Sequence, residues 1–347
     1  MAIVIGCDMH TRFQQLAVLD TESGVIEELR RENEPLEEVR RLYARWPAPA
    51  TVAIEATGYA RWFSELMAEL GHTLVVGDPA KLRAMAIRKQ KTDRRDALHL
   101  AAVYARGDFP RVWAAGPEAW EIRHLLRRRQ LAVNLRRQVK IRLQGLAMSR
   151  GLRRGPHLHT RAGQRQLAEL ALPPQERAHC DEACELLAEF NRRVEALDQA
   201  AEARAAAEPR ACLLRTHPGV GPVTALAWLA WVGEAKRFTT SNQLVSYVGL
   251  NPSEYSSGGG RQKLGHISKQ GNRYLRHLLV EAAVTAGRLD PVLARFYRRK
   301  LAGKHLGAAR VAVARKLAVR MYWMDKRSAT YSDLWGDADA GLPVARS

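Results

Sequence analysis

The order of apolar segments in the first part of the chain constrains the fold more than any other feature. "AIVIGCD" (2–8) has the pattern of a buried strand, and "QQLAVLD" (14–20) and "GVIEELRRE" (24–32) are further extended segments joined by the turn-like "TESG". Because short turns join neighbouring antiparallel strands, we expect these segments to open one sheet in antiparallel fashion. The alternating segments that follow are a helix at 35–46, a strand at 51–56, a helix at 60–71 and a strand at 73–79.

Three strands followed by alternating helices and strands is the order of a ribonuclease H-like α/β fold. We therefore predict such a domain over residues 1–115. A chain of 347 residues with 46% hydrophobic residues is long enough for more than one core. From apolar residues at helical spacing we predict a basic helical or coiled-coil connector at 116–208, a mainly helical domain at 209–330 and a tail at 331–347.

Acidic residues interrupt these otherwise apolar strands. Asp8 follows "IVIGC" and Glu55 lies inside "TVAIEATG", where an unpaired charge would be costly. Asp93 and Asp96 lie one turn apart at the start of a predicted helix and project from one face. Each acid alone has an ordinary explanation, as a helix cap, a first-turn charge or a solvated strand end. Together they can hold one or two Mg²⁺ ions, which phosphoryl transfer uses to orient a phosphodiester.

The basic residues predict a polyanionic partner. The formal net charge is +19, and residues 122–166 contain Arg and Lys throughout but no Asp or Glu. A solvated helix surface is the alternative explanation, but a face without acids favours contact with phosphates. The residues of this predicted helix that we expect to bind nucleic acid are Arg127, Arg128, Arg136, Arg137 and Lys140.

No segment has the features of a membrane span or a signal peptide, so we expect a cytoplasmic protein that does not enter a membrane. The 4 cysteines lack paired spacing, which argues against structural zinc and a disulfide framework.

Two glycine-containing segments suggest phosphate contacts in the second half of the chain. Gly219 and Gly221 precede an apolar helix, and backbone N–H groups there can cradle a phosphate as helix-hairpin-helix motifs do, although a tight turn uses the same residues. Small residues at 256–260 form a loop, and we prefer a phosphate-binding loop to a flexible linker because a helix follows at once. The cations that we expect to hold the diester here are Arg261, Lys263, Lys269 and Arg273.

The segments "IGCDMH", "AIEATGY" and "KTDRRDA" resemble the signature segments of the DEDD transposases of bacterial insertion sequences. This resemblance implies an N-terminal domain similar to the RuvC-type Holliday-junction resolvases. It also implies that Asp8, Glu55, Asp93 and Asp96 are catalytic metal ligands, with Mg²⁺ as the cofactor and Mn²⁺ as its alternative.

The segments "FTTSNQLVSYVGLNP", "YSSGG" and "HISKQGNRYLRHLL" resemble the C-terminal domain of the same family. The family's nucleophilic serine matches Ser257, with Ser256 as the near alternative. Family members often have Lys soon after the first acid, whereas this chain has Thr11 and Arg12.

The resemblance implies a recombinase that excises and inserts an insertion sequence, guided by a structured noncoding bridge RNA and working as a homo-oligomer, either dimer or tetramer. Ser257 would attack a DNA phosphate to give a phosphoserine intermediate and a free 3′-OH. One alternative is a junction-resolving nuclease that activates water, which a covalent protein–DNA adduct would exclude. The other is a non-catalytic nucleic-acid-binding protein, which would not need all of the predicted metal ligands.

Overall fold

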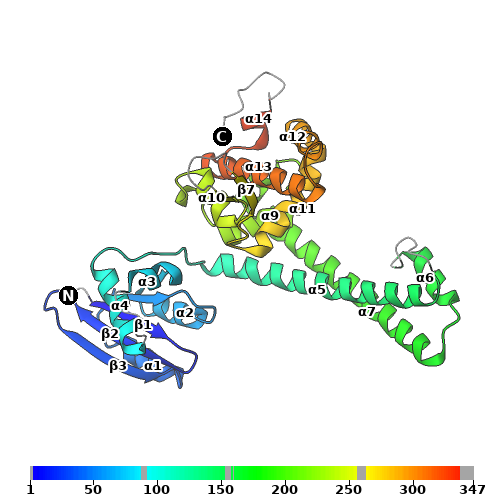
Figure 1. The fold of residues 1–347 in the computed structure, drawn as a ribbon. Helices are drawn as coiled ribbons and strands as arrows, with labels where there is room; N and C mark the ends of the chain where they lie inside the picture. Colours follow the sequence, from blue (N-terminus) through cyan, green and yellow to red (C-terminus); the bar gives the residue numbers. More distant parts are fainter. Residues whose placement is uncertain (1–2, 87–91, 153–157, 159, 256–262, 337–347) are drawn as a thin grey trace. The chain divides into compact units, whose positions relative to one another are not determined.

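The computed structural model describes residues 3–86, 92–152, 158, 160–255 and 263–336 (Figure 1). The chain divides into two compact units, Met1–Ala114 and Ala115–Ser347. Each unit is described by itself below.

The first unit is built on a five-stranded sheet with the order β3-β2-β1-β4-β5. Its strands are β1 (Ile3–Met9), β2 (Phe13–Asp20), β3 (Ile26–Glu32), β4 (Thr51–Glu55) and β5 (Thr73–Gly77). β1, β2 and β3 pair antiparallel, whereas β4 pairs parallel to β1 and β5 parallel to β4. The helices are α1 (Leu36–Tyr43), α2 (Arg61–Glu69), α3 (Pro79–Met85) and α4 (Asp93–Ala105). The predicted antiparallel opening and the helix–strand alternation after it are both confirmed.

Side chains alternate across β1, so its residues face two different layers. Ile5, Cys7 and Met9 point into a core that includes Tyr43 of α1 and Phe63 of α2. This core closes one face of the sheet and holds β1 in its centre.

The other face of β1 packs against α4. Val4 shares a small apolar cluster with Ala97 and Ala101 of α4. A Cβ at Gly6 would lie 2.6 Å from the backbone nitrogen of Ala101 and closer still to the carbonyl oxygen of Ala97. The missing side chain of Gly6 therefore lets α4 lie directly on the strand.

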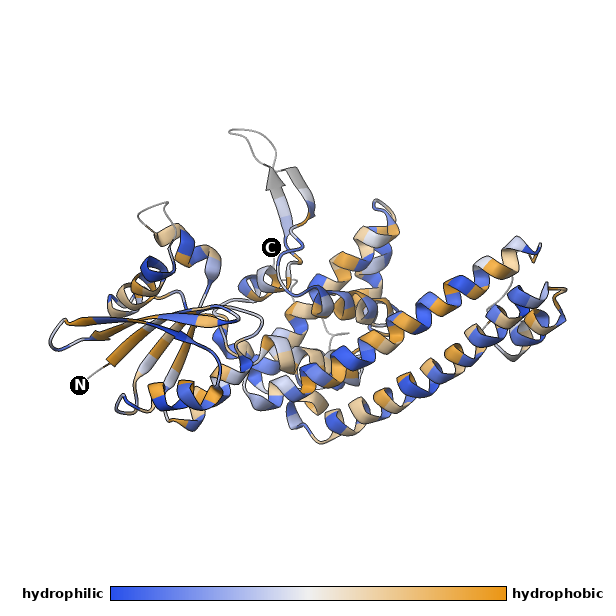
Figure 2. Ribbon diagram, turned by 90° about the horizontal axis from the view of Figure 1, so that it is seen from below, coloured by the Kyte–Doolittle hydropathy of each residue, from blue (hydrophilic) through white to orange (hydrophobic). Residues whose placement is uncertain are grey.

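The second unit begins with a helical hairpin. Its helices are α5 (Pro117–Ser149), α6 (Arg161–Glu169) and α7 (Pro174–Ala206). α5 and α7 lie side by side, and hydrophilic and hydrophobic residues alternate along both (Figure 2). They run antiparallel, because Arg150 at the end of α5 pairs with Glu176 near the start of α7, and Arg129 pairs with Asp198.

The base of this hairpin belongs to the core of the helices that follow. Ile122 and Leu126 of α5 and Ala201 and Ala205 of α7 are buried in the same cluster as Trp228. The later elements are α8 (Pro209–Arg215), α9 (Pro222–Ala227), η1 (Trp228–Val232), η2 (Ala235–Arg237), α10 (Ser241–Val248), α11 (Arg273–Leu289), α12 (Pro291–Leu301), α13 (Leu306–Arg327) and α14 (Tyr331–Trp335). The mainly helical second half expected from the sequence is thus observed.

A buried polar group joins the helices of this core. Asp325 of α13 accepts hydrogen bonds from the indole Nε1 of Trp228 at 2.9 Å and from the guanidinium of Arg210, at 2.8 Å from Nη2 to Oδ1. Because a buried carboxylate needs such partners, the contacts tie α8, η1 and α13 together.

One two-stranded sheet was not predicted. β6 (Pro252–Tyr255) and β7 (Lys263–Ile267) pair antiparallel, with Tyr255 opposite Lys263. Residues 256–262, which connect them, lie outside the described residues. No helix in the described part of the chain is both long enough and apolar enough to cross a membrane.

Candidate active site

β1 brings a carboxylate to the α4 side of the sheet. Val4, Gly6 and Asp8 alternate with the core-facing residues of the strand, so all three face α4. Asp93 and Asp96 occupy the first turn of α4. The close packing at Gly6 therefore holds the start of this helix near the end of β1.

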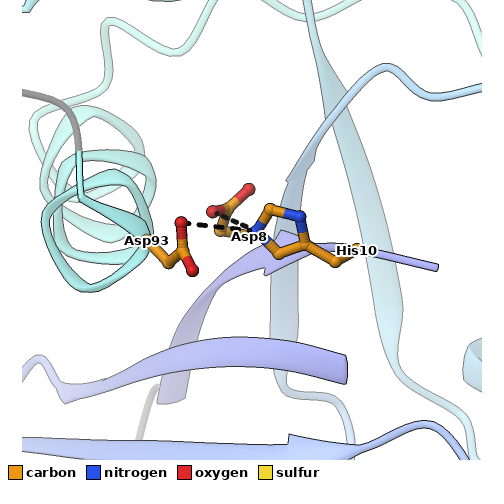
Figure 3. Close-up of side chains that lie close together, drawn as sticks. All are labelled: Asp8, His10 and Asp93. Carbon is orange, nitrogen blue, oxygen red and sulfur yellow. Dashed lines mark hydrogen bonds and ion pairs between the residues drawn. The ribbon is translucent and has the colours of Figure 1, made fainter. Parts of the chain in front are cut away.

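His10 joins two of the predicted acids. Its Nε2 lies 3.1 Å from Asp8 Oδ2 and 3.5 Å from Asp93 Oδ1 (Figure 3). One ligand atom from each of the three side chains lies within 4.8 Å of the others. A strand residue and a helix residue that are distant in sequence thus meet at one point.

The electrostatics of this point favour a cation. Burial raises the pKa of the Asp8 carboxyl, and the charges of Asp96 and Asp93 raise it further, while His10 opposes them. One oxygen of Asp96, Oδ2, is itself buried. Carboxylates gathered in this way repel one another, and a positive ion between them would relieve that repulsion.

Glu55 ends β4 at the level of Asp8. Cys7 pairs with Ile54, so Asp8 and Glu55 are the next residues on neighbouring parallel strands. Ala53, two residues earlier on β4, packs in a cluster with residues of α4, so Glu55 faces the same side of the sheet.

Only two of the four predicted acids belong to the close group of ligand atoms. Among the described residues, the group with ligand atoms within 4.8 Å of one another contains Asp8, His10 and Asp93 but neither Glu55 nor Asp96. Glu55 shares the edge of the sheet with this group, and Asp96 acts on it through its charge.

His10 was not among the residues predicted from the sequence. Its backbone carbonyl accepts a hydrogen bond from Asn33 Nδ2 at 2.8 Å, and the Asn33 amide oxygen accepts one from buried Gln14 at 3.3 Å. The imidazole stacks on Phe13, with ring centroids 4.5 Å apart. The available signal was its spacing, since residues two apart at the end of a strand face the same side.

The donor set fits a divalent cation. Carboxylate oxygens suit Mg²⁺ and Mn²⁺, and an imidazole nitrogen adds a ligand that transition metals accept. Burial and, to a smaller extent, the charges of Asp96 and Asp93 raise the pKa of Asp8, and a bound cation would favour its ionised form.

The predicted nucleophile belongs to the segment that connects β6 and β7. Ser257 and the alternative Ser256 lie outside the described residues, as do Arg261 and the side chain of Lys263. Lys269 is exposed, and its φ of 55° is a left-handed conformation that is uncommon for a residue with a side chain. Such conformations cluster at functional sites.

The predicted basic residues of α5 lie at or near the surface. Arg127, Arg128 and Arg137 are exposed, and Arg136 and Lys140 are half-buried. Burial and the nearby Arg136 lower the pKa of Lys140. Like charges are therefore crowded along this helix, as expected for a surface that meets an anion.

The two glycines of the predicted phosphate cradle differ. Gly219 has a φ of 94°, and a Cβ there would lie 2.5 Å from the backbone nitrogen of Ala286 in α11. Close helix packing alone therefore requires this glycine. Gly221 is exposed and precedes α9, and a Cβ there would meet no atom within 4 Å.

Comparisons with known proteins identify the family of the chain. Residues 5–148 match the profile of a transposase of the IS110 type that carries the DEDD domain, and residues 211–298 match the transposase IS116/IS110/IS902 family. The chain belongs to the IS110 transposase family. The first match covers the acid cluster and the second covers most of the helical region after the hairpin.

Several relatives of the transposase span most of its length. It is 29% identical to a probable family 20 transposase of Pseudomonas aeruginosa, over 80% of this chain and 82% of the relative. It is 28% identical to the transposase for insertion sequence element IS1328 of Yersinia enterocolitica, over 80% and 83% of the two chains. A pilin gene-inverting protein of Moraxella lacunata is 34% identical over 33% of this chain and 36% of its own. Transposases cut and rejoin DNA, so the family sets DNA recombination as the activity.

Proposed function

We propose that this transposase cuts DNA at the site formed by Asp8, Glu55, Asp93 and Asp96, on a first unit of the ribonuclease H-like, RuvC-like type. The strand order β3-β2-β1-β4-β5, with its antiparallel opening, supports that fold. The observation that carries the proposal is the meeting of Asp8 and Asp93 at one imidazole nitrogen, at 3.1 and 3.5 Å.

Asp8, Asp93 and His10 would hold a divalent cation, Mg²⁺ or its substitute Mn²⁺, with Glu55 and Asp96 beside them. When bound, such an ion neutralises charge on the phosphodiester and orients it. The chain's own contribution is positional, because the packing of α4 on Gly6 and the stack of His10 on Phe13 fix the donors before DNA arrives.

Ser257 is the proposed nucleophile, on the strength of the family resemblance of "YSSGG". Its Oγ forms a bond to phosphorus while the bond from phosphorus to the 3′ oxygen breaks. The hydroxyl proton passes to a base or to solvent, and the departing oxygen gains a proton to become a 3′-OH. Attack by a 3′-OH on the phosphoserine reverses these steps and rejoins the strands.

The proposed partners are DNA, a structured bridge RNA and further copies of the chain in a dimer or tetramer. The exposed cations of α5, Arg128 and Arg137 among them, support binding to a nucleic acid. The RNA and the oligomer rest on the family resemblance alone.

The proposal is tested by replacing the acids one at a time. Asp8→Asn, Glu55→Gln, Asp93→Asn and Asp96→Asn should each abolish recombination of a plasmid that carries the element's ends. DNA binding should persist, because the basic helix is unchanged. Wild-type recombination in the Asp8 and Glu55 variants would remove the basis for a carboxylate site.

A matched control separates chemistry from loss of an acidic charge. Glu65 is an exposed acid that pairs with Arg61, at 2.9 Å, and it belongs to α2, which packs on the face of the sheet opposite to α4. Glu65→Gln should recombine at the wild-type rate. Equal losses in Glu65→Gln and Glu55→Gln would instead indicate a general effect of charge.

A further inference from the structure

A cleft of about 470 Å³ lies where α5 meets the start of α11, and we call it the hairpin-base cleft. One wall is a single face of α5. Arg127, Gln130, Leu131 and Asn134 have the spacing of one helix face, and all line the cleft. The wall therefore combines a cation, two amides and an apolar side chain.

The opposite wall is fixed in place by aromatic packing. The rings of Trp231 and Tyr274 meet edge to face with centroids 5.3 Å apart. The Tyr274 hydroxyl donates to the backbone carbonyl of Leu126 in α5, at 3.4 Å. The side chain of Asn272 accepts from the N–H of Leu275, at 2.8 Å, and so caps α11.

A close backbone approach fixes the start of α11 as well. Gly271 has a φ of 88°, and a Cβ there would collide with the carbonyl group of Tyr247. The next residues, Asn272 and Arg273, line the cleft. This wall is thus held by packing and does not depend on a ligand for its shape.

The charge of the cleft is positive. No acid lines it, and within the described part of the chain neither Arg127 nor Arg273 forms an ion pair with a carboxylate. Burial and the charge of Arg273 lower the pKa of neighbouring Arg276. The charges of both lining arginines are therefore not neutralised by a carboxylate, and the Arg127 guanidinium lies over the Trp120 ring, 5.7 Å from its centroid, a contact that leaves its N–H groups able to bind an anion.

A second cleft on the hairpin has the opposite character. It has a volume of about 500 Å³ and is lined by Glu195, Asp198 and Glu202 together with Arg136. Its acids would repel a phosphate. The positive lining of the hairpin-base cleft is therefore not shared by this second cleft.

We propose that the hairpin-base cleft binds one unpaired nucleotide of a single-stranded nucleic acid segment. Arg127 and Arg273 hold its phosphate, and the amides of Gln130 and Asn134 contact the polar edge of its base. The volume lies within the range of about 300–1,000 Å³ that is typical of small-ligand sites.

An unpaired nucleotide fits better than a duplex for a chemical reason. Leu131 is 60% exposed and, with Tyr274, gives the cleft an apolar surface for the face of a base. In a duplex the base faces are stacked and hidden, whereas in single strands they are free to contact side chains. The proposal rests on the proposed function, because a transposase must hold nucleic acid strands that are opened during exchange.

Fluorescence anisotropy with short labelled oligonucleotides tests the proposal on the full chain. The probes are a single-stranded RNA, a single-stranded DNA of the same sequence and the blunt DNA duplex. Arg127→Ala and Arg273→Ala should each raise the Kd for single strands about tenfold, as expected when a charge-assisted hydrogen bond is lost. The effect on the duplex should be smaller, and the RNA and DNA arms show which kind of strand the cleft prefers.

Arg193→Ala is the matched control, because Arg193 is an exposed arginine of the same hairpin that pairs with Glu189. It should leave the Kd nearly unchanged. Equal losses in all three variants, or equal losses for single strands and duplex, would overturn the proposal, since they would indicate net charge or backbone contact alone.

Gln130→Ala adds a test that does not change charge. It should lower the discrimination among single strands of different bases while the thermal midpoint stays unchanged. If base discrimination is the same as in the wild type, the base is not bound in the cleft. These binding measurements do not depend on strand cleavage by Ser257. Nucleotide binding in the hairpin-base cleft and cleavage by Ser257 can therefore each be disproved without the other.

Discussion

Gly6 of β1 lies directly against Ala101 of α4, and a Cβ at Gly6 would lie 2.6 Å from the backbone nitrogen of Ala101. The clash would be with backbone, which cannot turn aside as a long side chain can. This contact sets the depth at which α4 sits on the sheet. It therefore also sets the position of Asp93 relative to Asp8.

Gly6→Ala should push α4 away from β1 and destabilise the first unit by about 1–3 kcal/mol, the usual cost of overpacking. Gly58→Ala is the control, because a Cβ at Gly58 meets no atom within 4 Å. Urea unfolding measures the free energy of unfolding of both variants. A Gly6→Ala protein as stable as Gly58→Ala would show that α4 does not lie this close to the strand.

Asp8→Asn should stabilise the metal-free protein at neutral pH while it removes recombination. Because the folded state raises the pKa of Asp8, the folded state binds a proton more tightly than the unfolded chain does. The Asp8 carboxyl therefore contributes to the free energy of unfolding at low pH, and this contribution is lost as the pH rises through the pKa that Asp8 has in the folded state. Denaturation curves of wild type and variant should diverge as pH is raised from 4 to 8.

Divalent metal ions should make the wild type more stable than Asp8→Asn, which reverses the order expected without metal. A ligand that binds only the folded state raises its stability by mass action. Mn²⁺ should therefore raise the thermal midpoint of the wild type and leave that of Asp8→Asn nearly unchanged. A midpoint of the wild type that does not respond to Mn²⁺ would contradict a metal site at Asp8, His10 and Asp93.

His217 should make the second unit sensitive to acid. Burial, with a smaller effect from Arg320, lowers the pKa of His217 from 6.5 to about 4. Between these values the unfolded chain binds a proton that the folded chain does not, so stability falls as pH drops through this window. The loss should approach about 3 kcal/mol, at about 1.4 kcal/mol per pH unit.

His217→Gln should flatten this pH dependence in urea unfolding at pH 7 and pH 5. The exposed His277 of α11 supplies the control, because His277→Gln should keep the wild-type pH dependence. If His217→Gln loses as much stability on acidification as the wild type, another group is responsible.

The basic face of α5 should be visible in the salt dependence of DNA binding. Each phosphate contact contributes about 0.7–0.9 to the slope of log affinity against log salt. Arg128→Ala and Arg137→Ala should each reduce the steepness by about that amount. An unchanged slope in both variants would mean that this face does not meet the phosphates.

The strands of the first unit could be predicted from the sequence because the pattern of apolar residues that defines them is local. Alternating apolar residues defined the strands, and Asp8 and Glu55 stood out as acids within them. His10 did not stand out, because its role depends on the end of β1 meeting the start of α4, which is a tertiary contact. The role of Gly6 is tertiary in the same way.

The second unit was harder to predict for physical reasons. Glycines before a helix serve both phosphate binding and close packing, and only the approach of Gly219 to Ala286 shows the packing role. The strands β6 and β7 are short, and the pattern of so few residues does not identify a strand. Arg127 and Arg273 were both predicted as cations, but their shared cleft depends on how α11 docks on α5.

Formation of a covalent bond between Ser257 and DNA tests the central claim most directly. Because the proposed step leaves a free 3′-OH, the protein would carry the 5′ phosphate, so a DNA strand labelled at its 3′ end should migrate with the protein in a denaturing gel. The substrate is DNA spanning the element's ends, with the RNA that copurifies with the protein. Wild type and Ser256→Ala should form the adduct and mass spectrometry should place it on Ser257, whereas Ser257→Ala and Asp8→Asn should form none. Cleavage that persists in Ser257→Ala, with DNA ends free of protein, would contradict the account and favour a nuclease that uses water.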